Sequence, residues 1–141
     1  MADVNYETCI EAVRAFFSKC PYLSDDYPIN VDFLGDVKGY SIDTLPGNPV
    51  YKRYVDGMEV PQYEYTFTSK EAYDGDARTT IANAGFYEKI VSWVREQSRK
   101  RNYPDISGHK VQRNEVTSTG YLFTVDSDLA RYQAQFRLVF L

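Results

Sequence analysis

Apolar and polar positions alternate most regularly at the end of the chain. Over residues 129–141 the sequence reads LARYQAQFRLVFL. Because successive side chains of a strand point to opposite faces, this pattern predicts a long final strand with one buried and one solvent-facing side. The predicted buried positions are Ala130, Tyr132, Ala134, Phe136, Leu138 and Phe140. The predicted solvent-facing positions are Arg131, Gln133, Gln135 and Arg137.

The same alternation predicts further strands upstream. Turn residues divide these segments: Pro46-Gly47-Asn48-Pro49 is a strong breaker, and Asp56-Gly57 is typical of a hairpin turn. Residues 69–76 are expected to form a loop or the irregular start of a helix. The expected strands are 29–33 and 40–44 as one hairpin, 50–55, 62–68, 111–118 near a sheet edge, and 120–125.

Two segments have the spacing of amphipathic helices, residues 5–19 and 76–101. Asp3 or Asn5 is expected to cap the first helix, and Gly85 to kink or split the second. The stripe expected on the second helix comprises Ala77, Ile81, Phe86, Ile90, Trp93, Val94 and Gln97.

These elements predict an α+β fold in one domain, residues 1–141. Its order is α-β-β-β-β-α-β-β-β, with an antiparallel-rich or mixed sheet of four to six strands packed on two helices. Both helices are expected on one face of the sheet. The expected core includes Val13, Ile90, Trp93, Phe136 and Leu138.

Composition narrows the class of protein. The 141 residues carry a net charge of −4, which argues against non-specific attraction to nucleic acid as the main activity. We also expect no sequence-specific nucleic-acid partner. Thirteen Tyr and eight Phe suit half-buried strands or protein interfaces. No signal peptide and no apolar run of about 20 residues is visible, so we expect no membrane and a cytoplasmic location in the producing cell.

Candidate chemistry is sparse. His109 is the one histidine, without a nucleophile motif around it, and is expected to be a surface residue. Cys9 and Cys20 are expected on one helix about 16 Å apart, too far for a disulfide, as small buried hydrophobes. No metal-ligand or phosphate-cradle spacing occurs, so we expect no catalytic residue, no cofactor and no metal. A basic cluster, Arg95, Arg99, Lys100 and Arg101, ends the second helix and either complements its dipole or binds an anion or an acidic partner.

Several phrases in the chain resemble one family. They are INVDFLG at 29–35, YSIDTLPGNPVYKRYVDG at 40–57, GFYEKIVSWVREQ at 85–97, STGYLF, and ARYQAQFRL in the final strand. In these phrases the chain resembles minor capsid or minor tail proteins of phages and prophages of Gram-positive bacteria, related to the tail terminator (tail completion) family.

The resemblance implies a non-enzymatic virion assembly protein. Tail terminators form rings, typically hexamers, at the head-proximal end of the tail; they stop the tube from growing and offer a surface to the head. The implied partners are further copies of the chain, the tail tube protein and head–tail connector proteins. The implied location is the virion, after the cytoplasm of the bacterial host. The residue types of 46–61 favour an interface there, with Tyr51, Arg53, Tyr54 and Met58 as candidates, although Tyr51 and Tyr54 alternatively cover their own sheet.

Two other classes remain open. One is a small-molecule-binding or enzymatic cone-shaped α+β domain whose pocket is lined by aromatic residues. Those residues would be Tyr63, Tyr65, Phe67, Trp93 and Tyr132. The other is a phage structural adaptor that forms no ring.

Overall fold

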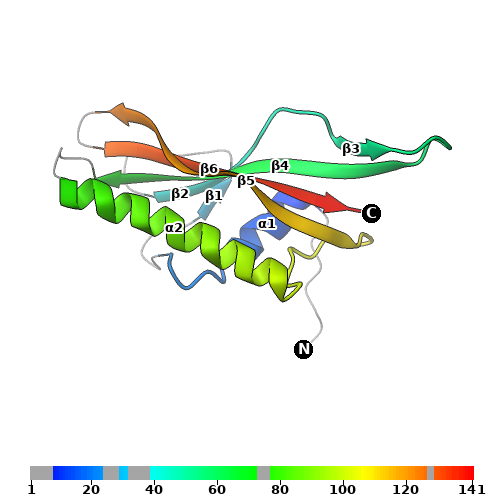
Figure 1. Cartoon of the computed structure of the whole chain (residues 1–141), viewed down its shortest axis with the longest axis horizontal. Helices are drawn as coiled ribbons and strands as arrows, with labels where there is room; N and C mark the ends of the chain where they lie inside the picture. The colour runs from blue at the N-terminus through cyan, green and yellow to red at the C-terminus, as the bar shows by residue number, and fades with distance from the viewer. Residues whose placement is uncertain (1–7, 24–28, 32–38, 73–76, 127–128) are drawn as a thin grey trace.

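A computed structural model describes residues 8–23, 29–31, 39–72, 77–126 and 129–141. It has the predicted α+β fold, with a mixed, mostly antiparallel six-stranded sheet and two helices (Figure 1). The elements in chain order are α1 (Cys9–Phe17), β1 (Ile29–Val31), β2 (Gly39–Thr44), β3 (Val50–Arg53), β4 (Glu59–Ala72), α2 (Ala77–Arg99), β5 (Val111–Asp126) and β6 (Leu129–Phe140).

The sheet is built around β4 and β6. Its strand order is β1-β2-β4-β6-β5, and β3 pairs with β4 outside this path. β4 and β6 pair antiparallel from Gln62↔Val139 to Ala72↔Leu129. This long register places the alternating apolar side chains of both strands on the same face, where they form one continuous core surface.

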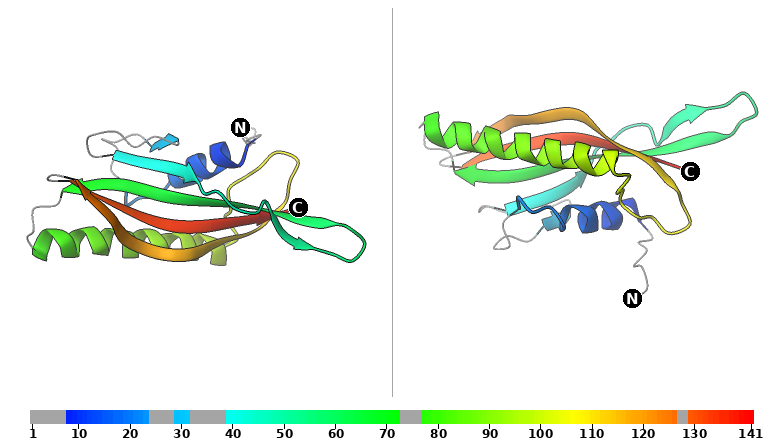
Figure 2. Two further views of the ribbon diagram at one scale, coloured as in Figure 1. Left: turned by 90° about the horizontal axis from the view of Figure 1, so that it is seen from above. Right: turned by 60° about the horizontal axis from the view of Figure 1, so that its bottom comes forward.

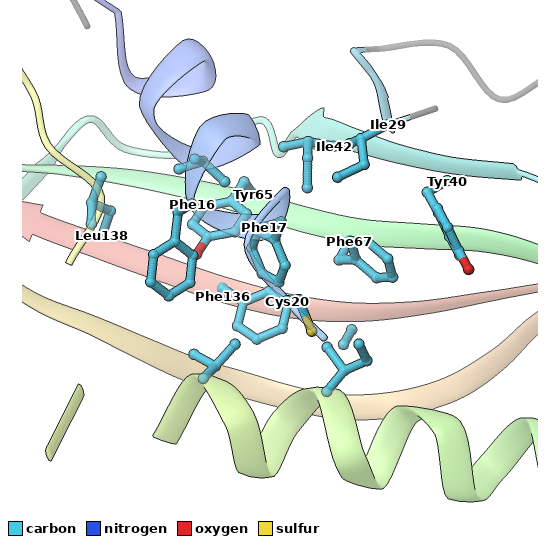
Figure 3. Packing of buried hydrophobic residues seen from close by; sticks show 14 of the residues in the cluster. Phe16, Phe17, Cys20, Ile29, Tyr40, Ile42, Tyr65, Phe67, Phe136 and Leu138 are labelled. Atoms are coloured by element: carbon cyan, nitrogen blue, oxygen red, sulfur yellow. The ribbon is translucent and has the colours of Figure 1, made fainter. Parts of the chain in front are cut away.

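Both helices lie on that face of the sheet (Figure 1). The ring of Phe17 in α1 lies at the centre of the core, 5.3 Å from Phe67, 5.6 Å from Phe136 and 6.0 Å from Trp93 of α2 between ring centroids. Figure 3 shows this aromatic cluster between α1 and the sheet. Val13, Ile90, Phe136 and Leu138 are fully buried as predicted, and Trp93 packs against the cluster while partly exposed.

Helix α1 is shorter than the spacing predicts. Thr8 caps it: its Oγ1 accepts the Glu11 N–H at 3.3 Å and donates to Glu11 Oε1 at 2.8 Å. This reciprocal pairing satisfies a free helix donor, so the cap is not Asp3 or Asn5, which lie outside the described residues. The helix ends at Phe17 and two turns follow, so Lys19 and Cys20 are not helical.

Helix α2 runs unbroken through Gly85. The predicted stripe is wrong at Ile81, which is 69% exposed, whereas Tyr87 is buried. The hydroxyl of Tyr87 hydrogen-bonds Ser69 Oγ at 2.7 Å and donates to the Tyr132 carbonyl at 3.0 Å. A tyrosine is therefore tolerated in the core because its polar tip reaches partners on the sheet.

Three strand predictions are corrected. β1 pairs with β2 in parallel, Ile29↔Tyr40, and so forms no hairpin with it; alternation reveals a strand but not its direction. Residues 69–72 continue β4 instead of forming a loop. The two strands expected over 111–125 are one strand, β5, which forms the predicted edge. Its register shifts repeatedly against β6, and such bulges bend a strand without ending it.

The outer face of β6 is less exposed than predicted. Gln133 is buried and its Nε2 donates to Tyr121 Oη at 2.5 Å, while Arg131, Gln135 and Arg137 are half-buried. Long side chains lying along a sheet cover one another, so polar character does not imply full exposure. Within the described ranges, no helix has both the length and the apolar character required to cross a bilayer.

Candidate functional site

The hairpin formed by β3 and β4 extends past the ends of β5 and β6 (Figure 2). Its turn is closed by the Tyr54 N–H, which donates to the Met58 carbonyl at 2.7 Å, and by the Gly57 N–H, which donates to the Tyr54 carbonyl at 3.0 Å. Asp56 Oδ1 accepts the Met58 N–H at 3.0 Å. Gly57 has a φ of 90°, which glycine adopts without strain, so the Asp56-Gly57 signal in the sequence is confirmed as a hairpin turn.

The end of this hairpin is apolar and exposed. Val55 is fully exposed, Met58 is 62% exposed and Tyr54 is 47% exposed. Lys52 Nζ lies 4.9 Å from the centroid of the Tyr54 ring. We call residues 54–58 the hairpin tip. An isolated exposed valine or methionine is ordinary, but three large apolar side chains at one projecting turn form a patch of the kind that marks contacts with other molecules.

The base of the hairpin is attached to the outer face of the sheet. Two guanidinium groups lie over the Tyr51 ring, with the Cζ of Arg113 at 5.3 Å and the Cζ of Arg137 at 5.2 Å from the ring centroid. Glu115 accepts from Arg113 Nη1 at 3.0 Å and from Arg137 Nη2 at 2.8 Å. We call Tyr51, Arg113, Glu115 and Arg137 the Tyr51 clamp.

Electrostatics holds the clamp together. Partial burial acts to raise the pKa of Glu115, but hydrogen bonds from Arg137 and Arg113 outweigh it and leave that pKa below its ordinary value. The carboxylate is therefore charged at neutral pH and keeps both guanidinium groups beside the Tyr51 ring. Cation–π contacts of this kind orient an aromatic side chain as well as stabilise it.

The four candidate interface residues thus divide between two environments. Tyr51 is half-buried against its own sheet, whereas Tyr54 and Met58 belong to the exposed tip. Arg53 lies opposite Glu59 in the hairpin register and pairs with it at 2.6 Å. The guanidinium of Arg53 therefore supports the hairpin itself.

A second surface, not predicted from the sequence, is a cleft of about 670 Å³ on the helix side of the molecule. It lies among the end of α1, the C-terminal half of α2 and the segment 101–111. Its lining residues are Phe16, Lys19, Trp93, Gln97, Arg101, Asn102, Tyr103, Pro104, Asp105, His109, Lys110 and Val111. The rings of Phe16 and Trp93 lie 4.9 Å apart at its floor. Of the basic run noted at the end of α2, only Arg101 lines this cleft, and Lys19 and Lys110 come from distant parts of the chain.

The remaining candidate groups have structural environments. His109 is exposed, its Nδ1 lies 3.1 Å from the Leu141 carbonyl oxygen, and its ring packs edge-on against Phe140. Cys20 is buried and Cys9 half-buried; both are free thiols, and burial raises the pKa of each. A raised pKa disfavours the thiolate, which is the reactive form. Among the described residues no group of three His, Cys, Asp or Glu side chains is placed to hold a metal ion.

Aromatic residues expected to line an enclosed pocket mostly fill the core. Tyr65, Phe67 and Tyr132 are buried. The Tyr65 hydroxyl donates to Asn114 Oδ1 at 2.6 Å, and burial raises its pKa. Trp93 borders the cleft instead.

Compared with known proteins, the chain matches no family model and no curated sequence.

Proposed function

We propose that this chain is a non-enzymatic virion assembly protein, a ring-forming tail terminator that caps a phage tail tube and joins it to the head. The observation that carries the proposal is the projecting β3–β4 hairpin with its apolar tip. The phrases that resemble the tail terminator family include β3 and the turn of this hairpin as far as Gly57, since one of them covers residues 40–57. The resemblance also implies an antiparallel or mixed sheet packed against helices, and the sheet of this chain is mixed.

The tip has the composition of an interface core. Aromatic residues and Met are enriched at such cores, and charged residues are depleted from them. Tyr54, Val55 and Met58 are its apolar members and are all exposed, and Asp56 uses Oδ1 to accept the Met58 N–H. Burying these side chains against a neighbouring subunit would remove apolar surface from water at about 25 cal/mol per Å².

The Tyr51 clamp makes that contact less costly. A hairpin held in one direction loses little conformational freedom on binding, and preorganisation of this kind raises affinity. Arg113 and Arg137 belong to β5 and β6, so the clamp fixes the hairpin to the main sheet. The proposed partners are further copies in a ring, the tail tube protein and the head–tail connector. The proposed location is the head-proximal end of the tail.

Electron microscopy of the phage that encodes the chain tests the function. Deleting the gene should give abnormally long tubes and unjoined heads, because nothing would stop tube growth. Tails of normal length attached to heads in the deletion strain would refute the terminator function.

A tip variant tests the role of the hairpin. Tyr54→Ala with Met58→Ala should fold normally and fail to cap tails. Arg53 is left intact because Arg53→Glu would place two carboxylates opposite each other in the register with Glu59 and disturb the hairpin itself. The matched control is Ile81→Ala, which truncates an exposed apolar side chain elsewhere. Tails of normal length in phage that carries the double variant would refute the role of the hairpin tip in capping.

A further inference from the structure

The segment that follows α2 turns through an unusual residue. Arg101 has a φ of 58°, the left-handed conformation that non-glycine residues rarely adopt. The Asn102 N–H donates to the Gln97 carbonyl at 2.9 Å, and the Arg101 N–H donates to the Ser98 carbonyl at 3.1 Å. These two bonds form a Schellman helix end, in which the left-handed position is usually Gly.

An arginine at this position is strained, and its side chain lines the cleft. A strained backbone conformation is stable only where the surrounding structure imposes it, and such conformations are frequent at functional positions. The geometry of the helix end does not require a guanidinium, because Gly would serve better there. The arginine at this position therefore places a guanidinium in the lining of the cleft at a cost in backbone strain.

Three cations without a carboxylate partner in the described residues also lie in the lining of the cleft. They are Lys19, Arg101 and Lys110. Asp105 is the one acidic residue of the lining. Both helices end here, and each C-terminus is equivalent to about half a negative charge. By formal charge the lining therefore carries three cations against one carboxylate.

A cleft lined by the Phe16 and Trp93 rings and by cations is complementary to a segment that has large apolar side chains and a carboxylate. The hairpin tip is such a segment: Tyr54, Val55 and Met58 surround Asp56. The volume of about 670 Å³ is of the size that holds a compact ligand, and the side chains of one turn are such a group. No residue of β3 or β4 lines the cleft, so the tip of the same chain does not fill it.

We propose that the cleft receives the β3–β4 hairpin tip of a second copy of this chain. Val55 and Met58 contact Phe16 and Trp93, and Asp56 faces Arg101 and the other cations. This rests on the proposed function, since it specifies how a ring of identical subunits would close.

The contact is heterologous, because a tip on one subunit meets a different surface on the next. Such contacts give closed rings when the rotation between subunits closes, and open filaments otherwise. Each subunit has one tip and one cleft. Every subunit of a ring therefore uses both, and disabling either one prevents closure.

Two variants test the hairpin tip and the cleft independently. Val55→Asp places a charge at the exposed tip, and Arg101→Asp reverses a charge of the cleft with a residue that tolerates the left-handed conformation. The matched controls are Ile81→Asp, an exposed apolar position on α2, and Arg95→Asp, an exposed cation of α2 outside the cleft. Self-association is followed by sedimentation velocity and native mass spectrometry, and unchanged melting temperatures establish that each variant is folded.

Each single variant should weaken self-association by about tenfold or more, and the controls should assemble like the parent. An equimolar mixture of Val55→Asp with Arg101→Asp should give a 1:1 heterodimer and nothing larger. In that mixture one intact tip meets one intact cleft, and no further contact is possible.

Parent-like assembly of either variant would overturn this inference. So would a mixture that stays monomeric while the parent forms rings. In both cases the terminator function would stand, with a different subunit contact. Normal tails in the gene-deletion strain would instead refute the function itself, whatever the variants do in solution.

Discussion

Gly120 is the position at which a single methyl group should be most disruptive. An alanine Cβ there would lie 2.4 Å from Tyr87 Cβ and 2.5 Å from Tyr87 Cγ, against about 3.5–4.0 Å for an ordinary carbon contact. These are the inner atoms of the Tyr87 side chain, so rotation of the ring cannot relieve the clash. The backbone of β5 would have to move away from α2 by about 1 Å.

The surroundings resist that movement. Tyr87 is held by hydrogen bonds to Ser69 and to the Tyr132 carbonyl. Overpacking a core costs about 1–3 kcal/mol, and loss of one buried hydrogen bond adds about 1 kcal/mol. We therefore expect Gly120→Ala to lower the free energy of unfolding by about 2–4 kcal/mol, measured by urea titration.

The matched control is the same substitution in α2. An alanine Cβ at Gly85 meets no atom within 4 Å, so Gly85→Ala should raise the free energy of unfolding by about 1 kcal/mol through helix propensity alone. The two substitutions thus have opposite expected signs. A Gly120→Ala protein within about 0.5 kcal/mol of the parent would refute the close packing of β5 on α2.

Three further outcomes follow from the structure. Phe136→Ala should lower the free energy of unfolding in urea by about 3–5 kcal/mol, and a loss below about 1 kcal/mol would remove Phe136 from the core. Because the pKa of Glu115 is lowered in the folded state, its stabilisation is present above the ordinary value of 4.5 and is lost as the pH falls through the folded pKa. Thermal melts from pH 6 to pH 3 should therefore show a shallower acid loss for Glu115→Gln than for the parent, and identical slopes would contradict the clamp. Arg101→Gly should raise the melting temperature by about 1–4 °C through relief of strain and at the same time weaken self-association, whereas a lower melting temperature would contradict the strain.

Periodicity was sufficient for the elements that line the core. Phe136 and Leu138 alternate with polar residues in β6, and a strand with one buried face leaves little choice of register. The class of fold and the common face of both helices followed from such patterns. The direction of β1 did not, because alternation is the same in parallel and antiparallel strands.

Glycine gave misleading signals in both halves of the chain. Gly85 resembles a break in α2 yet lies within a continuous helix, since one glycine costs a helix only about 1 kcal/mol. Gly120 resembles a turn between two strands yet lies inside β5, where it permits Tyr87 to approach. Its need for a small residue depends on a side chain in another element, which no local pattern contains.

Of the two candidate surfaces, the sequence indicated the hairpin tip but not the cleft. Composition indicated Tyr54 and Met58, and both are exposed at the hairpin tip. The cleft was not predictable, because Lys19, Arg101 and Lys110 are brought together by the tertiary fold and the left-handed conformation of Arg101 has no sequence signature.

Some residues of the hairpin hold it on its own sheet, and others are exposed for contact with a partner. Only variants of the second group test the contact without changing the hairpin. Tyr51 contacts Arg113 and Arg137 of the same chain, so its removal would disturb the direction of the hairpin as well as any contact that the hairpin makes. Val55 is fully exposed and absent from the core, so a charge there leaves the folded subunit unchanged. Loss of assembly in a Tyr51 variant would therefore not distinguish a misdirected hairpin from a lost interface. Loss of assembly in Val55→Asp, at an unchanged melting temperature, identifies the tip as a contact surface.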